Sequence, residues 1–258
     1  MISFSQKKFQ RSLKPTDQQL KSLGLKEGPN TITFKVQLGA RESPQVSAAL
    51  YFWRGDPKFV ISDIDGTITK SDALGHIMPI LGKDWSHSGV ACLYNNVIKN
   101  GYKIIYLSSR AIGQAGTTRT YLTNLRQNGV TLPPGPVLMS PFRLLTAFKK
   151  EVIDRRPEVF KIACLKDIKS ISPPNSSPFY AGFGNRVTDL ISYESVGIPR
   201  ARIFIINPAG EIRTTNKTFT QSYASLNDIV EMVFPPNHRV DPSYDAFSFW
   251  KLPLPPLD

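Results

Sequence analysis

The chain has 258 residues, 41% of them hydrophobic, which is enough for one sizeable core and a smaller attached unit. Its formal charge of +12 favours an anionic partner such as nucleic acid, a phospholipid surface or a phosphorylated substrate, although solubility alone explains such a charge equally well. Only Cys92 and Cys164 are present, without a CxxC pair, which argues against a disulfide scaffold or a cysteine zinc site and favours a reducing cytosolic or nuclear setting.

The first 30 residues are polar and basic, and they lack the apolar core of a signal peptide. No segment approaches the roughly 20 apolar residues that span a bilayer, so we expect any membrane contact to be peripheral. Two strand-like runs follow, Thr31–Leu38 and Ala48–Trp53, and the first alternates apolar and polar residues. Because two strands rarely stand alone, we expect residues 1–56 to hold a basic segment and part of a small β-unit that needs more strands.

From residue 57 to residue 236 the pattern changes to apolar runs that alternate with helix-like segments. The expected strands are Phe59–Ser62, Lys103–Leu107, Val137–Met139, Phe179–Phe183 and Arg202–Ile206. The expected helices are Val90–Lys99, Thr117–Gln127, Phe142–Ile153, Lys161–Ile171 and Val187–Val196. This alternation predicts an α/β fold with a parallel sheet, helices on both faces, and ligands at the carboxyl ends of the strands. An aromatic and proline-rich tail over residues 237–258 ends the chain.

Two aspartates spaced by one residue, Asp63 and Asp65, follow the first of these strands in the stretch FVISDIDGT. Burying a carboxylate costs free energy, so two aspartates beside a core strand indicate that something requires them there. An arbitrary pair of aspartates with this spacing is more often a capping turn. Further polar residues stand near the ends of later elements: Ser108, Ser109, Lys161, Asn185 and Asp189. In this order they resemble the four motifs of the haloacid dehalogenase superfamily of aspartate-dependent phosphotransferases.

Each of the later residues also has a simpler explanation when it is taken alone. Ser108 could cap a strand end, and Asn185 and Asp189 could cap the following helix. Lys161, expected to begin its helix, could be a solvated lysine, and one of the lysines at positions 149 and 150 could take its role. Their joint occurrence in the right order favours the phosphotransferase interpretation.

The resemblance implies a coherent chemistry. Asp63 would attack phosphorus and form an aspartyl-phosphate, while Asp65 would protonate the leaving alkoxide and later deprotonate a water. Two carboxylates beside a phosphate call for a divalent cation, and Mg²⁺ suits hard oxygen ligands. We expect its ligands to be Asp63, the main-chain carbonyl of Asp65 and Asn185, with Asp189 as a direct ligand or as support.

The remaining candidates would bind the phosphate or shape its site. Ser108 would donate a hydrogen bond to a phosphoryl oxygen, and Lys161 would offset negative charge. Gly66 would allow a sharp turn that the hydroxyl of Thr67 braces. The candidate substrate contacts are Gly66, Thr67, Ser109 and Arg110. For Arg110 a contact with the phosphate and a structural ion pair are equally good expectations.

The spacing of the motifs leaves no room for a large cap domain. The segments between Asp65, Ser108 and Lys161 are taken up by the helices and strands already named. An open site cannot enclose a small substrate, so it suits a phosphate displayed on a protein or a membrane.

A closer similarity covers nearly the whole chain. The stretch DIDGTITKSDALGHIMP, followed by LGKDW, is similar to the catalytic region of lipins, the Mg²⁺-dependent phosphatidate phosphatases. The similarity continues through NGYKIIYLSSRAIGQAGTTRTYL, FKIACLKDI and FYAGFGNRVTD. It implies an enzyme that hydrolyses phosphatidate to diacylglycerol and phosphate. Such an enzyme would be cytoplasmic and peripherally bound to the endoplasmic reticulum or nuclear membrane, with phosphatidate as its partner and no nucleic acid.

Two features leave alternatives open. Lipins also have an N-terminal region that completes an immunoglobulin-like β-unit, and nothing before Asp63 resembles that region. The resemblance therefore implies that the strands within residues 1–56 are part of a β-sandwich. A phosphatidate-binding module without turnover is disfavoured because both aspartates are present, and a DxDxT-type protein phosphatase is disfavoured by the lipin-like stretch. In the tail, Phe247, Phe249 and Trp250 either insert at the headgroup level of a membrane or pack against the domain.

Overall fold

The computed structural model describes residues 15–36, 44–70, 85–141, 157–214 and 220–237. Two compact units make up the chain, one ending at Gly55 and the other beginning at Asp56, close to the boundary expected from the sequence. The expected helix Phe142–Ile153, the lysines at 149 and 150, and the aromatic residues of the tail lie outside the described residues. None of the helices in the described ranges combines the length and the apolar character that crossing a bilayer requires.

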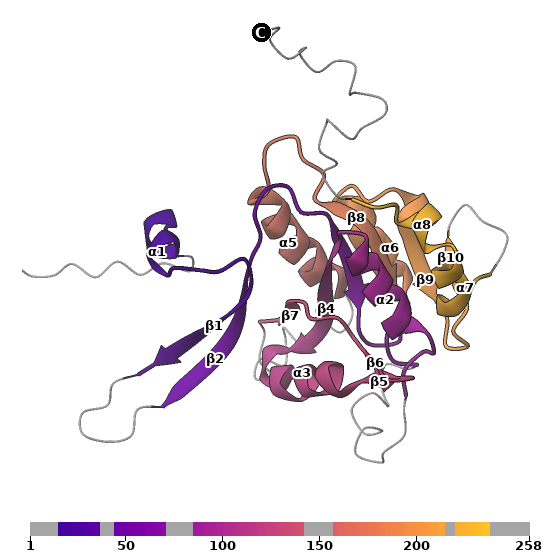
Figure 1. Cartoon of the computed structure of the whole chain (residues 1–258), viewed down its shortest axis with the longest axis horizontal. Coiled ribbons are helices and arrows are strands. Elements are labelled where there is room, and N and C mark those ends of the chain that lie inside the picture. Colours follow the sequence, from indigo (N-terminus) through magenta and orange to yellow (C-terminus); the bar gives the residue numbers. More distant parts are fainter. Residues whose placement is uncertain (1–14, 37–43, 71–84, 142–156, 215–219, 238–258) are drawn as a thin grey trace, which may run out of the picture. The chain divides into compact units, whose positions relative to one another are not determined.

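The first unit contains a short helix and a hairpin (Figure 1). Helix α1, Asp17–Ser22, begins with a capping box in which Thr16 and Gln19 satisfy each other's main-chain N–H groups. Strands β1, Gly28–Lys35, and β2, Gln45–Phe52, pair antiparallel. These described elements do not form a sandwich, so the immunoglobulin-like unit remains a prediction.

The second unit is built on a sheet of six strands. Its order is β10-β9-β8-β3-β4-β7. The strands are β3 Phe59–Asp63, β4 Lys103–Ala111, β7 Val137–Ser140, β8 Phe179–Gly184, β9 Ile203–Ile206 and β10 Ile212–Thr214. All neighbours are parallel except β10, which runs antiparallel to β9. The predicted parallel α/β sheet is therefore confirmed, and it is consistent with a haloacid dehalogenase-like fold.

Helices cover both faces of this sheet. All five residues of β3 are buried, as expected for a strand that is covered on both sides. Val60 belongs to a core cluster with residues of α2 and α7. On the opposite face Ile61 pairs with Gly182, where an added Cβ would stand 2.5 Å from the ring of Tyr193 in α6. The helices are α2 Val90–Lys99, α3 Ala115–Asn124, α5 Pro157–Ser170, α6 Val187–Ser195, α7 Tyr223–Asp228 and α8 Val230–Val233.

Three expectations about local structure were wrong. The helix expected over Thr117–Gln127 ends at Asn124, and β5, Arg126–Gln127, pairs with β6, Val130–Thr131. Between these strands Asn128 and Gly129 have φ values of 50° and 80°, typical of a tight hairpin turn. Lys161 does not begin its helix but lies about one turn inside α5. Ser108 does not terminate its strand, because β4 continues to Ala111.

A closed loop leaves the sheet next to the end of β3. The N–H of Lys70 donates to the carbonyl of Trp85 at 2.9 Å, and Thr69 forms a β-bridge with Ser86. The N–H of His87 donates to the carbonyl of Ile68, also at 2.9 Å. The chain therefore leaves at Lys70 and returns beside it at Trp85.

Candidate active site

The turn after β3 places two aspartates at the carboxyl edge of the sheet. The carbonyl of Ile64 accepts hydrogen bonds from the N–H groups of Thr67, Ile68 and Thr69 at 3.3, 2.9 and 3.1 Å. Gly66 has a φ of 77°, which a side chain would disfavour. Its N–H donates to the hydroxyl of Thr69 at 3.0 Å. The turn expected at Gly66 is therefore present, although Thr69 braces it more directly than Thr67.

Two buried tyrosines, Tyr94 and Tyr223, hold this turn in place from the protein core. The hydroxyls of Tyr94 and Ser62 lie 2.8 Å apart, and Ser62 donates to the carbonyl of Asp63. Tyr223 of α7 donates to the carbonyl of Thr67 at 2.9 Å. Burial raises the pKa of both tyrosines, so they stay neutral and keep their protons for these contacts. The end of β3 and the end of the turn are thus both fixed from the core.

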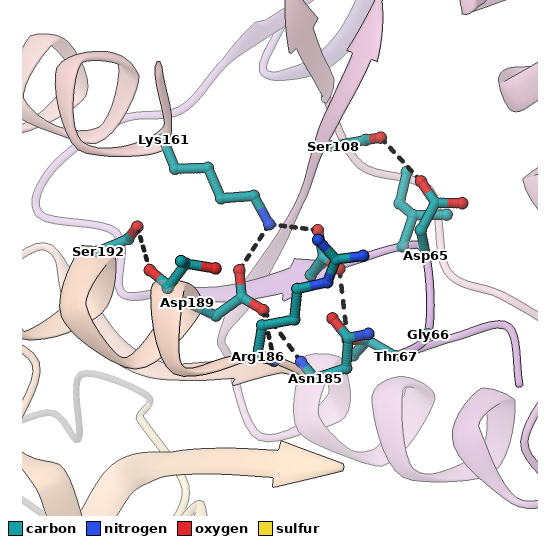
Figure 2. A network of polar contacts seen from close by, with 12 residues as sticks. Asp65, Gly66, Thr67, Ser108, Lys161, Asn185, Arg186, Asp189 and Ser192 are labelled. Atoms are coloured by element: carbon teal, nitrogen blue, oxygen red, sulfur yellow. Dashed lines mark hydrogen bonds and ion pairs between the residues drawn. The ribbon is translucent and has the colours of Figure 1, made fainter. Parts of the chain in front are cut away.

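Lys161 joins two buried carboxylates. Its Nζ lies 2.5 Å from Asp63 Oδ1 and 2.6 Å from Asp189 Oδ1 (Figure 2). All three residues are buried: Asp63 of β3 and Lys161 of α5 are each 4% exposed, and Asp189 of α6 is 1% exposed. Three of the residues predicted from the sequence therefore meet here, and Lys161 is the cation between the other two.

The charges in this cluster are not balanced. Burial alone would lower the pKa of Lys161, but the charges of Asp63 and Asp189 outweigh it and raise that pKa, so the lysine stays protonated. Burial raises the pKa of Asp63 to about 7, with Lys161 opposing the shift and the carboxylates of Asp189 and Asp65 adding to it. When Asp63 is ionised, two carboxylates and one ammonium leave an excess negative charge, which a further cation would compensate.

Both oxygens of Asp189 accept hydrogen bonds. Its Oδ1 accepts from Lys161, and its Oδ2 accepts from the N–H groups of Asn185 and Arg186 at 3.0 Å each. The chain must pass very close to this carboxylate, because a Cβ on Gly184 would stand 2.4 Å from the Cβ of Asp189. These contacts hold Asp189 against Lys161 and against the main chain at the start of α6.

We predict that Gly184→Ala disrupts this arrangement. The new methyl group would displace Asp189 and with it Lys161, so we expect a loss of about 1–3 kcal/mol in the free energy of unfolding. Urea denaturation of the purified protein measures it. Gly116→Ala is the matched control: Gly116 lies in α3 with nothing within 4 Å of its added Cβ, and the same change there should be neutral or slightly stabilising. Equal losses in the two variants would contradict the prediction.

Arg110 forms an ion pair with Asp65. Its Nε donates to Asp65 Oδ2 at 2.9 Å, and its Nη2 donates to Oδ1. Its Nη1 donates to the hydroxyl of Thr118, a fully buried residue of α3, at 3.2 Å. Ser108 Oγ also donates to Asp65 Oδ2, at 3.2 Å. Of the two expectations for Arg110, the structure has the ion pair.

The other expected residues lie around this centre. Asn185 follows β8 and is half-buried, and Thr67 Oγ1 approaches Asp63 Oδ2 at 3.5 Å. Ser109 is next to Ser108 on β4, but no hydrogen bond joins its side chain to the other described site residues.

Two site residues were missed by the sequence analysis. Figure 2 shows the exposed Arg186 reaching from the start of α6 toward the middle of the network. Its position directly after Asn185 was the only signal. Thr118 gave none, because its contact with Arg110 depends on how α3 packs.

The oxygen atoms near Asp63 fit the magnesium ion that was predicted. Among the described residues no group of three or more His, Cys, Asp or Glu side chains forms a metal cage. The predicted set contains one carboxylate, one main-chain carbonyl and one amide. Thr67 Oγ1 makes a long contact of 3.5 Å with Asp63 Oδ2. Few, hard, neutral and anionic oxygens suit Mg²⁺, which retains several waters.

Comparison with known proteins identifies the family. Residues 11–235 match the LNS2 (Lipin/Ned1/Smp2) family model. "Phosphatidate phosphatase PAH1" of Arabidopsis thaliana is 52% identical over 93% of this chain and 27% of its own length. "Phosphatidate phosphatase LPIN1" of Homo sapiens is 48% identical over 97% of the chain and 29% of its own. "Phosphatidic acid phosphohydrolase 1" of Saccharomyces cerevisiae is 47% identical over 90% of the chain and 28% of its own length.

The chain thus spans less than a third of the length of these three relatives. The matched range contains the turn after β3, Lys161 and Asp189, so the similarity includes the whole described site. The resemblance to lipins drawn from the sequence motifs is confirmed. The chain belongs to the lipin/Ned1/Smp2 family.

Proposed function

We propose that this chain is the catalytic part of a Mg²⁺-dependent phosphatidate phosphatase, which converts phosphatidate to diacylglycerol and phosphate at a membrane surface. The observation that carries the proposal is the buried cluster of Asp63, Lys161 and Asp189 at the carboxyl end of the central strand. The names of the relatives supply the substrate. The residues supply the chemistry.

In the first step an oxygen of Asp63 attacks phosphorus, and the bond from phosphorus to the diacylglycerol oxygen breaks. Asp65 takes a proton from the bound phosphate group and gives it to that oxygen as it leaves. In the second step Asp65 takes a proton from a water molecule that attacks the aspartyl-phosphate, and phosphate leaves Asp63. Lys161 and Ser108 offset the charge that develops on the phosphoryl oxygens.

A bound Mg²⁺ would supply the positive charge that the cluster lacks. Asp63, the carbonyl of Asp65 and Asn185 would hold it, and Asp189 would keep Lys161 and the main chain at Asn185 in place. With this additional charge nearby, Asp63 would be ionised at neutral pH in spite of its burial.

Phosphate release distinguishes this function from its alternatives. The purified chain is given phosphatidate in mixed detergent micelles, with Mg²⁺ or with a chelator, and separately a phosphoserine peptide. We expect release from phosphatidate that depends on Mg²⁺ and little release from the peptide. Release from the peptide alone would favour a protein phosphatase. Binding of phosphatidate without any release would favour a binding module.

The hairpin of the first unit provides an argument for the proposal that another β-segment packs on it. Phe34 and Val46 are paired in register and are 56% and 65% exposed, so the hairpin leaves apolar surface uncovered. The relatives are more than three times as long as their matched region. In the proposed enzyme, an N-terminal lipin region outside this sequence packs on the hairpin and completes an immunoglobulin-like unit.

The proposed enzyme works in the cytoplasm, peripherally bound to the endoplasmic reticulum or the nuclear membrane. Its formal charge of +12 suits an anionic lipid surface, near which each basic residue contributes about 1 kcal/mol. We therefore predict that its affinity for vesicles containing phosphatidate falls as salt concentration rises, because salt screens these charges. Vesicle co-sedimentation measures the affinity, with zwitterionic vesicles as the control. An affinity that does not change with ionic strength would instead indicate apolar insertion.

A further inference from the structure

Two of the groups expected to bind the substrate phosphate, Arg110 and Ser108, are both bound to Asp65. Arg110 gives Asp65 two hydrogen bonds in a bidentate pair, and Ser108 gives it a third. A carboxylate with three donors resembles a bound phosphate in charge and in the hydrogen bonds that it accepts. Asp65 is therefore an anion of the protein itself that accepts hydrogen bonds from donors expected to bind the phosphate.

We propose that Asp65 and the substrate phosphate compete for Arg110, so that substrate binding transfers the guanidinium from the carboxylate to the phosphate. The proposal rests on the proposed function and adds to it. Arg110 becomes a phosphate-binding residue that is masked in the free protein, and Asp65 is released only when a phosphate is present.

The contacts of Arg110 are suited to such an exchange. Its side chain is 8% exposed and that of Asp65 is 18% exposed, so the pair lies at the edge of the site and not deep in the core. Its Nη1 is held separately by the buried Thr118. This third contact can remain while Nε and Nη2 change partner, since a guanidinium offers five donors in a fixed plane. The exchange then needs only a rotation about the Thr118 contact.

The exchange would also order the reaction. Arg110 and Ser108 donate to both oxygens of Asp65, so this carboxylate already accepts three hydrogen bonds before a leaving group is present. When the phosphate takes these donors, the carboxyl group becomes available at the same moment that the substrate is in place. Asp65 would then be positioned by the substrate itself.

The Arg110 Nε–H signal in ¹⁵N–¹H NMR spectra reports the partner of the guanidinium. It is assigned by its loss in Arg110→Lys, and inorganic phosphate is titrated into wild type and into Asp65→Asn with Mg²⁺ present. We expect the two signals to differ without phosphate, because only wild type has the ion pair. At saturation they should converge, because both guanidiniums then hold phosphate. We also expect at least tenfold tighter phosphate binding by Asp65→Asn, which lacks the competitor.

Arg200 is the matched control. It is paired with Glu194 and precedes β9, at the amino end of the sheet, so its signal should not move. The inference is overturned if the wild-type Arg110 signal stays in place while phosphate binds, or if neither protein binds phosphate. Phosphate release from phosphatidate is measured separately: release with an unmoved Arg110 refutes the exchange alone, and an exchange without release refutes the proposed function alone.

Discussion

Asp63→Asn is expected to lower phosphate release from phosphatidate by at least about 10⁴-fold, the order seen when an enzyme loses its nucleophile. The amide matches the carboxylate in shape but cannot attack phosphorus to form the acyl phosphate. Lys161 keeps its contact with Asp189, so the fold should persist. A phosphate assay in mixed micelles, with Mg²⁺ present, measures the rate.

The matched control is Asp228→Asn, because Asp228 is exposed at the end of α7 and has no contact with the site residues in the described structure. It removes the same charge and should leave the rate within about twofold of wild type. Circular dichroism of the Asp63→Asn protein confirms that it is folded. Substantial Mg²⁺-dependent release by folded Asp63→Asn protein would refute the assignment of the nucleophile.

Lys161→Met should have the largest effect on stability. Removing the lysine leaves Asp63 and Asp189 buried without their common cation, and breaking a buried pair in this way costs about 3–5 kcal/mol. The free energy of unfolding is measured by urea denaturation of the metal-free protein. Lys166→Met, on the exposed side of the same helix, should change it by less than about 0.5 kcal/mol. A loss of similar size in both variants would mean that the cluster is not responsible.

The loss in Lys161→Met should depend on pH. Without the lysine, burial and the remaining carboxylates hold the pKa of Asp63 even further above its ordinary 3.8. An acid whose pKa is raised on folding favours the folded state at low pH and loses that contribution as pH rises through the raised value. The variant should therefore be closer to wild type near about pH 5 than near about pH 8. In wild type, Lys161 has a pKa raised above 10.5, so its own contribution is complete throughout this range.

Much of the sheet and the central cluster could be predicted from the sequence. Continuous apolar runs mark the buried parallel strands, and each expected core strand is found within a few residues of its place. Because parallel strands end at one edge of the sheet, Asp63 and Asp189 had to lie near each other. Lys161 joins them although its place in its helix was mistaken.

Contacts that depend on tertiary packing could not be read from the pattern. Arg110 reaches Asp65 only because β4 extends beyond its apolar run. Tyr223 lies 156 residues from the carbonyl that it holds, and β10 is too short to produce a pattern. The hairpin at Asn128 and Gly129 was different, because Asn-Gly is a known turn signal and could have been recognised directly after the helix expected to end at Gln127.

The closed loop between Lys70 and Trp85 has a consequence for insertions into the chain. Its two ends are joined by a main-chain hydrogen bond and an adjacent bridge, so the sheet does not depend on the number of residues between them. Doubling the length of such a loop costs only about 0.6 kcal/mol in closure entropy. Insertions between Lys70 and Trp85 should therefore cost little in the free energy of folding, because the described ends of the loop keep their contacts with each other.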